Sequence, residues 1–355
     1  MSFGLQRRLN KTSRRILVIR PDRIGDVILS TPVFRTLKES FPGAFVGALV
    51  SPMTSPLLEH NPSIDVILTD TPADHTGGTS IWGKAREIRS YRFDTALLLM
   101  PTQRLAYILF LAGIRYRVGV GHILYEVLTL MHGVSRKNYN PLRHETDYML
   151  DLARKIGAAK IWQTPELFVT DDEKKVARDF LIKKGFMTDL PIVGLHPGSG
   201  GSAPNWTIAR YHRLADKISK AGNQVLVTGS GNEKQIAGFF EAHHIPGLQS
   251  SFGELSLREL TAVISQVDLF ISSSTGPMHI AAALGVPTVS MFCPLTACSP
   301  KLWGPLGNSA SVVSPAEAFC RTRCPGDPHV CTFGDGDEGI TVNDVFNLVN
   351  TVKVS

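Results

Sequence analysis

Three loops of the sequence carry residue types that could perform chemistry. The first, residues 21–30 (PDRIGDVILS), follows an apolar run and holds two carboxylates, Asp22 and Asp26, with Arg23 and Gly25 between them. A carboxylate here could accept a proton from a substrate hydroxyl, or it could cap the helix that we expect to follow. For an aspartate considered alone, helix capping is the more common role.

The second loop, residues 196–206 (HPGSGGSAPNW), follows the apolar run PIVGL and precedes a predicted helix. Its glycines and serines, Ser199 and Gly200 among them, would let backbone N–H groups and hydroxyls bind an anion. No Gly-Lys-Ser/Thr sequence closes the loop as in a Walker A motif, and it lacks the dinucleotide fingerprint GxGxxG. A flexible glycine loop without a ligand is the alternative.

The third loop opens the segment 272–287 (SSSTGPMHIAAALGVP), after the apolar run DLFI. Ser274, Thr275 and Gly276 would begin a helix, where hydroxyl donors and the helix dipole favour a bound phosphate. His279 falls in the first turn of this helix, where it could equally be a core histidine. Two anion-binding loops in one half of the chain indicate a diphosphate.

Three of the five cysteines, Cys320, Cys324 and Cys331, cluster in the segment CRTRCPGDPHVC, with His329 between them. Three thiolates and one imidazole can form a structural metal site, although this spacing matches no familiar ligand pattern. A loop of reduced thiols is the more common alternative. The sequence DGD at 335–337 is interpreted as a turn, so we predict no metal for the reaction.

Short apolar runs alternate with helical patterns along the chain and would position these loops. The first half contains ILVIR, AFVGALV, DVILT, TALLLM and RYRVGV, and the second contains PIVGLH, QVLVTG, DLFISS and PTVSMF. This alternation predicts βα units, parallel sheets and an α/β fold, with a domain boundary near residues 160–170. Ligands of open α/β sheets bind beyond the carboxyl ends of the strands, where all three loops would lie.

The composition predicts a globular protein, because 43% of the 355 residues are hydrophobic and the length suits two domains. No apolar run approaches the ~20 residues that span a bilayer, and no signal peptide is evident, so we expect a cytoplasmic protein. The net charge of +6 comes without a nucleic-acid-binding motif. An anionic substrate or membrane surface fits this charge better, and an ordinary basic surface explains it equally well.

Four segments, in this order and spacing, resemble glycosyltransferase family 9, the heptosyltransferases of lipopolysaccharide core assembly: RPDRIGDVILSTPVFRTLKESFP, HPGSGGSAPNW, VTGSGNEKQIA and STGPMHIAAALGVPTVSMF. The resemblance covers about residues 15–350. It implies the GT-B fold, in which two Rossmann-like domains with parallel sheets face each other across a cleft. It assigns residues 1–165 to acceptor binding and 166–355 to nucleotide-sugar binding, with a last helix that in such a fold could pack back on the N-terminal domain.

The resemblance also implies a role for each loop. Asp26 matches the family's general-base aspartate, and Asp22, Arg23 and Gly25 would contact the acceptor. The donor-binding residues would be Ser199, Gly200, Glu233, Ser274, Thr275, Gly276 and His279. The implied reaction is an inverting transfer, without metal or cofactor, of heptose from ADP-heptose to an anionic lipid-linked saccharide bearing Kdo or heptose, at the cytoplasmic face of the inner membrane.

One position departs from the family pattern. Pro204 stands where relatives often carry a basic residue, two positions before the tryptophan of the loop, and Arg210 or Lys301 could supply the missing charge. The departure motivates two alternatives: a family 9 enzyme with another nucleotide-sugar or a protein acceptor, and a nucleotide-sugar-binding protein that has lost catalysis. A nicotinamide oxidoreductase is disfavoured because no strand precedes GxGxxG. Four basic residues could meet the charge of the acceptor: Arg14, Arg104, Lys137 and Arg143.

Overall fold

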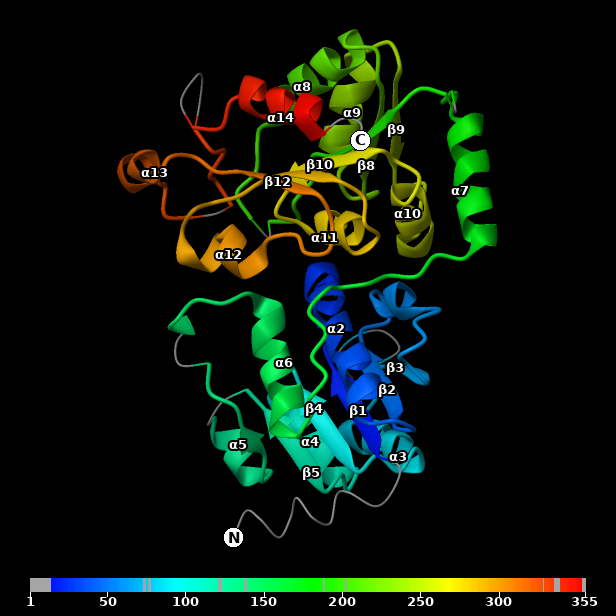
Figure 1. The fold of residues 1–355 in the computed structure, drawn as a ribbon, viewed down its shortest axis with the longest axis vertical. Helices are drawn as coiled ribbons and strands as arrows, with labels where there is room; N and C mark the ends of the chain where they lie inside the picture. Colours follow the sequence, from blue (N-terminus) through cyan, green and yellow to red (C-terminus); the bar gives the residue numbers. More distant parts are fainter. Residues whose placement is uncertain are drawn as a thin grey trace. The chain divides into compact units, whose positions relative to one another are not determined.

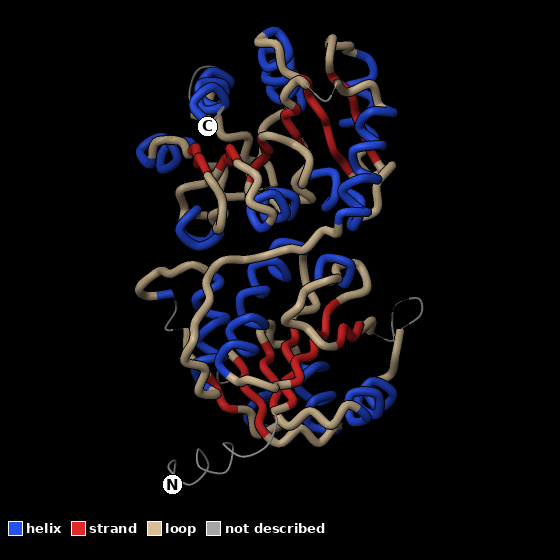
Figure 2. Tube along the Cα trace, turned by 45° about the vertical axis from the view of Figure 1, so that its right-hand side comes forward, coloured by secondary structure: helices blue, strands red, loops and turns tan. Residues whose placement is uncertain are grey.

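The structure, a computed structural model, describes residues 14–72, 75, 78–120, 123–136, 139–187, 189–201, 203–327, 329–334 and 339–352. The chain forms two compact units, Met1–Thr164 (unit 1) and Pro165–Ser355 (unit 2). In each unit, strands lie in a central sheet with helices packed around it (Figure 2). Each unit therefore has the layered construction of an α/β domain.

Unit 1 contains β1 (Arg15–Ile19), α2 (Ile24–Ser40), β2 (Phe45–Val50), η1 (Ser55–Leu58), β3 (Val66–Thr69), α3 (Ile81–Ser90), β4 (Thr95–Leu98), α4 (Gln103–Leu111), β5 (Tyr116–Gly119), α5 (Leu124–Leu128), β6 (His132–Gly133) and α6 (Glu145–Lys155). Its six strands are parallel, in the order β3-β2-β1-β4-β5-β6. The central β1 is apolar without interruption and fully buried from Ile16 to Ile19, because helices cover both faces of the sheet.

Unit 2 contains α7 (Asp171–Lys183), β7 (Ile192–His196), α8 (Ile208–Lys220), β8 (Gln224–Gly229), α9 (Lys234–Ala242), β9 (Leu248–Phe252), α10 (Leu257–Ile264), β10 (Leu269–Ser273), α11 (Gly276–Ala283), β11 (Thr288–Met291), η3 (Thr296–Cys298), α12 (Pro300–Trp303), β12 (Ala310–Val313), α13 (Glu317–Arg323) and α14 (Val342–Val352). Its six strands are also parallel, in the order β12-β11-β10-β7-β8-β9 (Figure 1).

The two sheets share one strand order. Counted within its own unit, each sheet runs 3-2-1-4-5-6, the doubly wound order of dinucleotide-binding folds. The predicted α/β class with two Rossmann-like parallel sheets is confirmed. In such sheets the connections turn to opposite sides at a switch point, which here falls between β1 and β4 and between β7 and β10. The three loops identified in the sequence follow β1, β7 and β10, at these two switch points.

The helix α14 completes the core of unit 2. It packs on α8 and lies against β11 and β12 (Figure 1), with Val345 and Val349 fully buried. Just before it, the Ile340 carbonyl accepts a hydrogen bond of 3.1 Å from the Trp206 indole. The apolar face of this helix packs within unit 2, and its packing on the N-terminal domain stays a prediction.

An exposed apolar patch covers α5 and its two ends in unit 1. The residues that form it expose 42% to 73% of their surface: Ile123, Leu124, Val127, Leu128 and Leu130. Contiguous apolar surface of this kind marks an interaction site more often than scattered exposed residues do. Among the residues that the structure describes, no helix is both long enough and apolar enough to cross a membrane.

Candidate active site

The β1–α2 loop places Asp26 in the first turn of α2. Arg23 occupies the N-cap position, its side chain is exposed, and it makes no capping hydrogen bond. Asp26 is the third helical residue, so it is not the cap of α2. The backbone N–H groups of Ile24 and Gly25 precede the first intrahelical hydrogen bond, which leaves them available to a ligand at the helix start.

A buried arginine, Arg20, connects the carboxylates of this loop. Only 6% of its side chain is exposed. Its guanidinium donates a hydrogen bond to the Asp26 carboxylate, its Nε lies 2.9 Å from Asp22 Oδ1, and its Nη1 lies 3.5 Å from Glu145 Oε1. Nη1 also donates to the Leu99 carbonyl, 3.2 Å away, just beyond β4. Arg20 therefore fixes Asp22 and Asp26 at the switch point of the unit 1 sheet.

A second arginine supports this arrangement through Glu145, the first residue of α6. Only 2% of the Glu145 side chain is exposed, and Arg136 donates to both of its carboxylate oxygens at 3.0 Å. Sequence reasoning missed Arg20, Arg136 and Glu145. A charged residue directly after the apolar run ILVI was the available signal for Arg20, whereas nothing local distinguishes Glu145 from an ordinary exposed glutamate.

Burial changes the acid–base behaviour of this loop. Burial and the neighbouring charge of Asp26 raise the pKa of Asp22 and Arg20 lowers it, with a net pKa of about 6. Burial works against the charge on Arg20 as well, but Asp22, Asp26 and Glu145 together raise its pKa. Asp22 therefore changes protonation close to neutral pH, beside a guanidinium that stays charged.

The other basic residues expected to meet the acceptor make contacts inside unit 1 instead. The Arg104 guanidinium forms a forked pair, 2.9 and 3.1 Å from the carboxylate oxygens of Asp70. Lys137 lies outside the described residues. The remaining two are Arg14, which donates to the Ile156 carbonyl, and Arg143, which pairs with Asp151. These contacts stabilise the unit, and a role for these residues in binding the acceptor stays a prediction.

In unit 2, the structure brings Glu233 to the loop after β7. Its carboxylate accepts hydrogen bonds from the Ser230 backbone N–H at 2.6 Å and the Ser230 hydroxyl at 3.0 Å. A Cβ added to Gly198 would overlap the Glu233 carboxylate, so glycine is required for this approach. Gly200, two residues further, has a φ of 54° that glycine adopts without strain. Ser199 and Gly200 thus lie in the loop that Glu233 packs against.

The β10–α11 loop contains a buried polar atom without a protein partner. Thr275 is the N-cap of α11, but its Oγ1 makes no capping bond and no hydrogen bond to any described residue. Ser274 precedes it and Gly276 begins the helix. Buried hydroxyls are normally paired, so this one points to a ligand at the positive end of α11. His279 is 5% exposed, as either a core residue or a ligand contact would be.

His196, at the end of β7, is a site residue that sequence reasoning did not single out. Its Nδ1 lies 3.0 Å from the Thr228 hydroxyl on the neighbouring β8. Burial lowers the pKa of His196, and the charge of Glu233 only partly opposes this effect. The imidazole is therefore neutral at physiological pH, and it lies at the start of the 196–206 loop.

The two candidates for the missing basic residue differ in burial. Arg210 is buried in α8 and donates to the carbonyls of Thr332 and Ile340, at 3.3 and 3.5 Å. These hydrogen bonds tie Arg210 to the C-terminal segment that contains Thr332 and Ile340. Lys301 is exposed on α12. Pro204 itself is buried, an environment that favours proline over an unpaired lysine or arginine.

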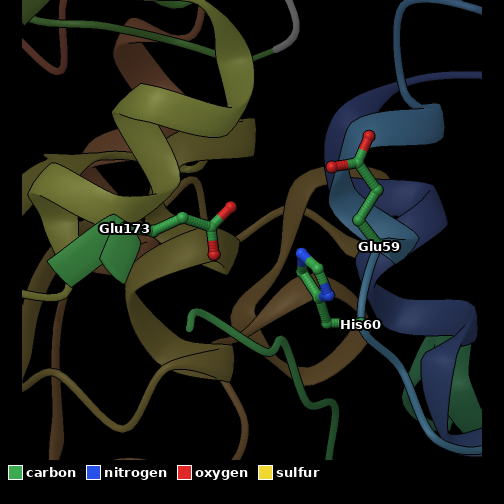
Figure 3. A group of neighbouring side chains, drawn as sticks. All are labelled: Glu59, His60 and Glu173. Carbon is green, nitrogen blue, oxygen red and sulfur yellow. The ribbon is translucent and has the colours of Figure 1, made fainter. Parts of the chain in front are cut away.

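Figure 3 labels Glu59 and His60, which follow η1 in unit 1, and Glu173, the third residue of α7 in unit 2. Glu173 forms a capping box with Thr170. Arg258 donates to both of its carboxylate oxygens, at 2.6 and 2.7 Å. These hydrogen bonds lower the pKa of Glu173 to about 2. The carboxylate therefore has a structural role, tying α7 to α10.

Comparison with solved structures agrees with the fold. The chain superposes on a family 9 glycosyltransferase from Veillonella parvula with a TM-score of 0.80, at 21% identity, covering 96% of this chain and 98% of the other. It superposes on the Escherichia coli ADP-heptose lps heptosyltransferase II with a TM-score of 0.76, at 22% identity, covering 95% and 98%.

Sequence comparison leads to the same family. The chain is 27% identical to lipopolysaccharide heptosyltransferase 2 of Salmonella typhimurium over 326 residues, which cover 87% of this chain and 90% of the relative. The family model described as glycosyltransferase family 9 (heptosyltransferase) matches residues 81–324, more than half of the chain. The resemblance found in the sequence motifs is confirmed, and this chain belongs to glycosyltransferase family 9.

Proposed function

We propose that this chain transfers heptose from ADP-heptose to a lipopolysaccharide core acceptor, with inversion at the anomeric carbon. The names of the Salmonella and Escherichia coli relatives support the sugar, the donor and the acceptor. The observation that carries the proposal for this chain is the Asp26 carboxylate, held by Arg20 beside the open N-terminus of α2 at the switch point of the sheet.

In this proposal Asp26 is the general base. The acceptor hydroxyl oxygen forms a bond to the anomeric carbon, the bond from that carbon to the diphosphate breaks, and the hydroxyl proton passes to Asp26. Asp22, Arg23 and Gly25 orient the acceptor. Arg23 suits this role because its side chain is exposed at the helix start, and Gly25 because it leaves the backbone N–H groups accessible.

Unit 2 binds the donor in this proposal. The N-terminus of α11, with Ser274, Thr275 and Gly276, stabilises the negative charge of the departing diphosphate. Ser199 and Gly200 contribute hydroxyl and backbone donors, and His279 closes the first turn. Glu233 accepts hydrogen bonds from the ribose hydroxyls, a role for which its position after β8 is suitable, since acidic residues after the second strand bind ribose in this class of sheet.

No divalent metal ion takes part in the transfer under this proposal, because hydroxyls, backbone N–H groups and a helix dipole replace it at the diphosphate. The acceptor is lipid-linked, and the protein reaches it at the cytoplasmic face of the inner membrane. The exposed apolar patch on α5 supports this location, since apolar side chains of this kind partition into the headgroup region of a bilayer.

The experiment is a transfer assay with ADP-heptose and Kdo-bearing lipid A, in the presence and absence of a chelator. We expect transfer under both conditions and a product of inverted anomeric configuration. The buried Pro204 is the one observation that favours a different nucleotide-sugar. A donor screen by thermal shift covers this alternative: stabilisation by another nucleotide-sugar and none by ADP-heptose would replace the proposed donor.

A further inference from the structure

The loop 197–206, which follows β7 at the switch point of the unit 2 sheet, contains no lysine or arginine. An anion in this loop is therefore held by backbone N–H groups and hydroxyls, whose alignment depends on the shape of the loop. Gly198, Gly200 and Gly201 give the chain many alternative shapes, and ordering them upon binding costs conformational entropy. A feature that fixes the loop in advance lowers this cost.

Asn205 closes this loop. Its side-chain amide donates a hydrogen bond of 2.6 Å to the carbonyl of Pro197, eight residues earlier and at the other end of the loop. Its backbone N–H donates to the Cys331 carbonyl at 3.1 Å, in the segment that precedes α14. Its amide oxygen accepts a hydrogen bond of 2.6 Å from the hydroxyl of Tyr211. Asn205 thus joins the two ends of the loop to each other, to α8 and to the C-terminal segment.

Tyr211, in the first turn of α8, fixes the orientation of the Asn205 amide. The Pro197 carbonyl can only accept, so the amide NH2 group faces it and the amide oxygen faces the Tyr211 hydroxyl. The Tyr211 side chain is fully buried, and its ring packs edge-on against Trp206 with the ring centroids 5.6 Å apart. Burial raises the pKa of Tyr211, and Ser273 at the end of β10 partly opposes this effect. The hydroxyl therefore stays protonated and available as a donor.

We propose that Asn205 is a positioning residue for the donor: together with Tyr211 it holds the uncharged loop in the shape that binds a diphosphate. The inference rests on the proposed function, which assigns this loop to the nucleotide-sugar. Pro204 stands where relatives often carry a basic residue, so preorganised N–H groups here take the place of a cation. Asn205 and Tyr211 act through the shape of the loop and take no part in bond formation.

The test compares ADP binding, measured by calorimetry, between the full native chain and the variants Asn205→Ala and Tyr211→Phe. Asn205→Ala should weaken ADP binding by about five- to ten-fold, the loss expected for one hydrogen bond. Tyr211→Phe removes only a hydroxyl and should weaken ADP binding by a smaller factor. Because Tyr211 acts through Asn205, the double variant should bind ADP no more weakly than Asn205→Ala alone. Unchanged ADP affinity in Asn205→Ala would overturn the inference.

The matched control is Tyr148→Phe in unit 1. Tyr148 is only 2% exposed and its hydroxyl donates to the Pro141 carbonyl at 3.1 Å, so its loss should lower stability without changing ADP affinity. In Asn205→Ala, KM for the nucleotide-sugar should rise while KM for the acceptor is unchanged. Adenosine, which lacks phosphates, should compete equally well in the native chain and the variant. Equal weakening of adenosine and ADP would indicate a general loss of structure and overturn the inference.

Amide hydrogen exchange in the free protein gives a measurement that does not depend on the identity of the donor. The backbone N–H of Asn205, which donates to the Cys331 carbonyl, should exchange faster in Tyr211→Phe than in the native chain. Equal exchange rates would overturn the inference even where transfer is observed. Faster exchange, with a native chain that binds no nucleoside diphosphate, would overturn the proposed function and with it the donor role of the loop.

Discussion

The Arg20 guanidinium donates a hydrogen bond to the Asp26 carboxylate and so joins the end of β1 to the first turn of α2. The same guanidinium contacts Asp22 and Glu145. Three carboxylates thus depend on one buried cation, and the orientation of the proposed base depends on all of them. The first two predictions separate the chemical role of Asp26 from the structural role of Arg20.

Asp26→Asn preserves shape and removes the ability to accept a proton. We expect the transfer rate to fall by ~10²–10⁴. Affinity for the donor nucleotide should change little, because the loops proposed to bind it belong to unit 2. Rate and nucleotide affinity are measured on the same purified variant. A rate within a few-fold of the native rate would remove Asp26 from the mechanism.

Arg20→Met would leave buried carboxylates without their cation. Breaking a buried ion pair by removing one partner costs about 3–5 kcal/mol of unfolding free energy. Denaturant unfolding measures the loss, and Arg321→Met is the control, since Arg321 forms an exposed pair with Glu317 that is worth well under 1 kcal/mol. Equal losses for the two variants would contradict the assignment of Arg20 as the buried hub.

Asp22, with a pKa raised to about 6, should produce an inflection in the pH dependence of the transfer rate. Below pH 6, Asp22 is protonated and no longer pairs with Arg20. The full positive charge of Arg20 then acts on Asp26 and makes it a weaker base, so the transfer rate should decrease as the pH is lowered. Asp22→Asn imitates the protonated form and should show the low rate without the inflection. A variant that keeps the inflection would assign it to another group.

Gly198→Ala should displace Glu233, because the added methyl group overlaps its carboxylate. We expect weaker binding of ADP, by about ten-fold if one charge-assisted hydrogen bond to the ribose is lost. Gly238→Ala in α9 is the control, since a Cβ there meets no atom within 4 Å. Calorimetry with ADP compares the two variants, and unchanged affinity in Gly198→Ala would remove Glu233 from the donor site.

Glu173 should make stability depend on pH in acid solution. Its pKa of about 2 lies below the usual value, so its contribution is fully present above about pH 4.5 and is lost as the pH falls toward 2. Arg258→Gln should lower stability by roughly 1–2 kcal/mol at pH 7 and reduce this acid dependence. Thermal unfolding across the pH range is the measurement, with the exposed Lys220→Gln as the control.

Local sequence patterns were sufficient for the sheets and for the loops that follow their strands. A strand buried on both faces is apolar without interruption, and a ligand-binding loop carries glycine and hydroxyl residues, so both leave a signal within a few residues. Glu145 leaves none. Its importance arises because the fold brings it to Arg20 from a distant position in the chain, and no short window contains both partners.

The position of α14 has a consequence for the order of folding during synthesis. The buried residues Ile340, Val345 and Val349 belong to the same hydrophobic core as Val193 on β7, so the core of unit 2 joins segments made early and late in the translation of that unit. Unit 1 uses only residues up to Thr164 and can fold on the ribosome while unit 2 is being made. Unit 2 cannot complete its core until α14 leaves the exit tunnel. Until then the apolar strands of unit 2 stay exposed, and this is the stage of synthesis at which we expect chaperones to bind.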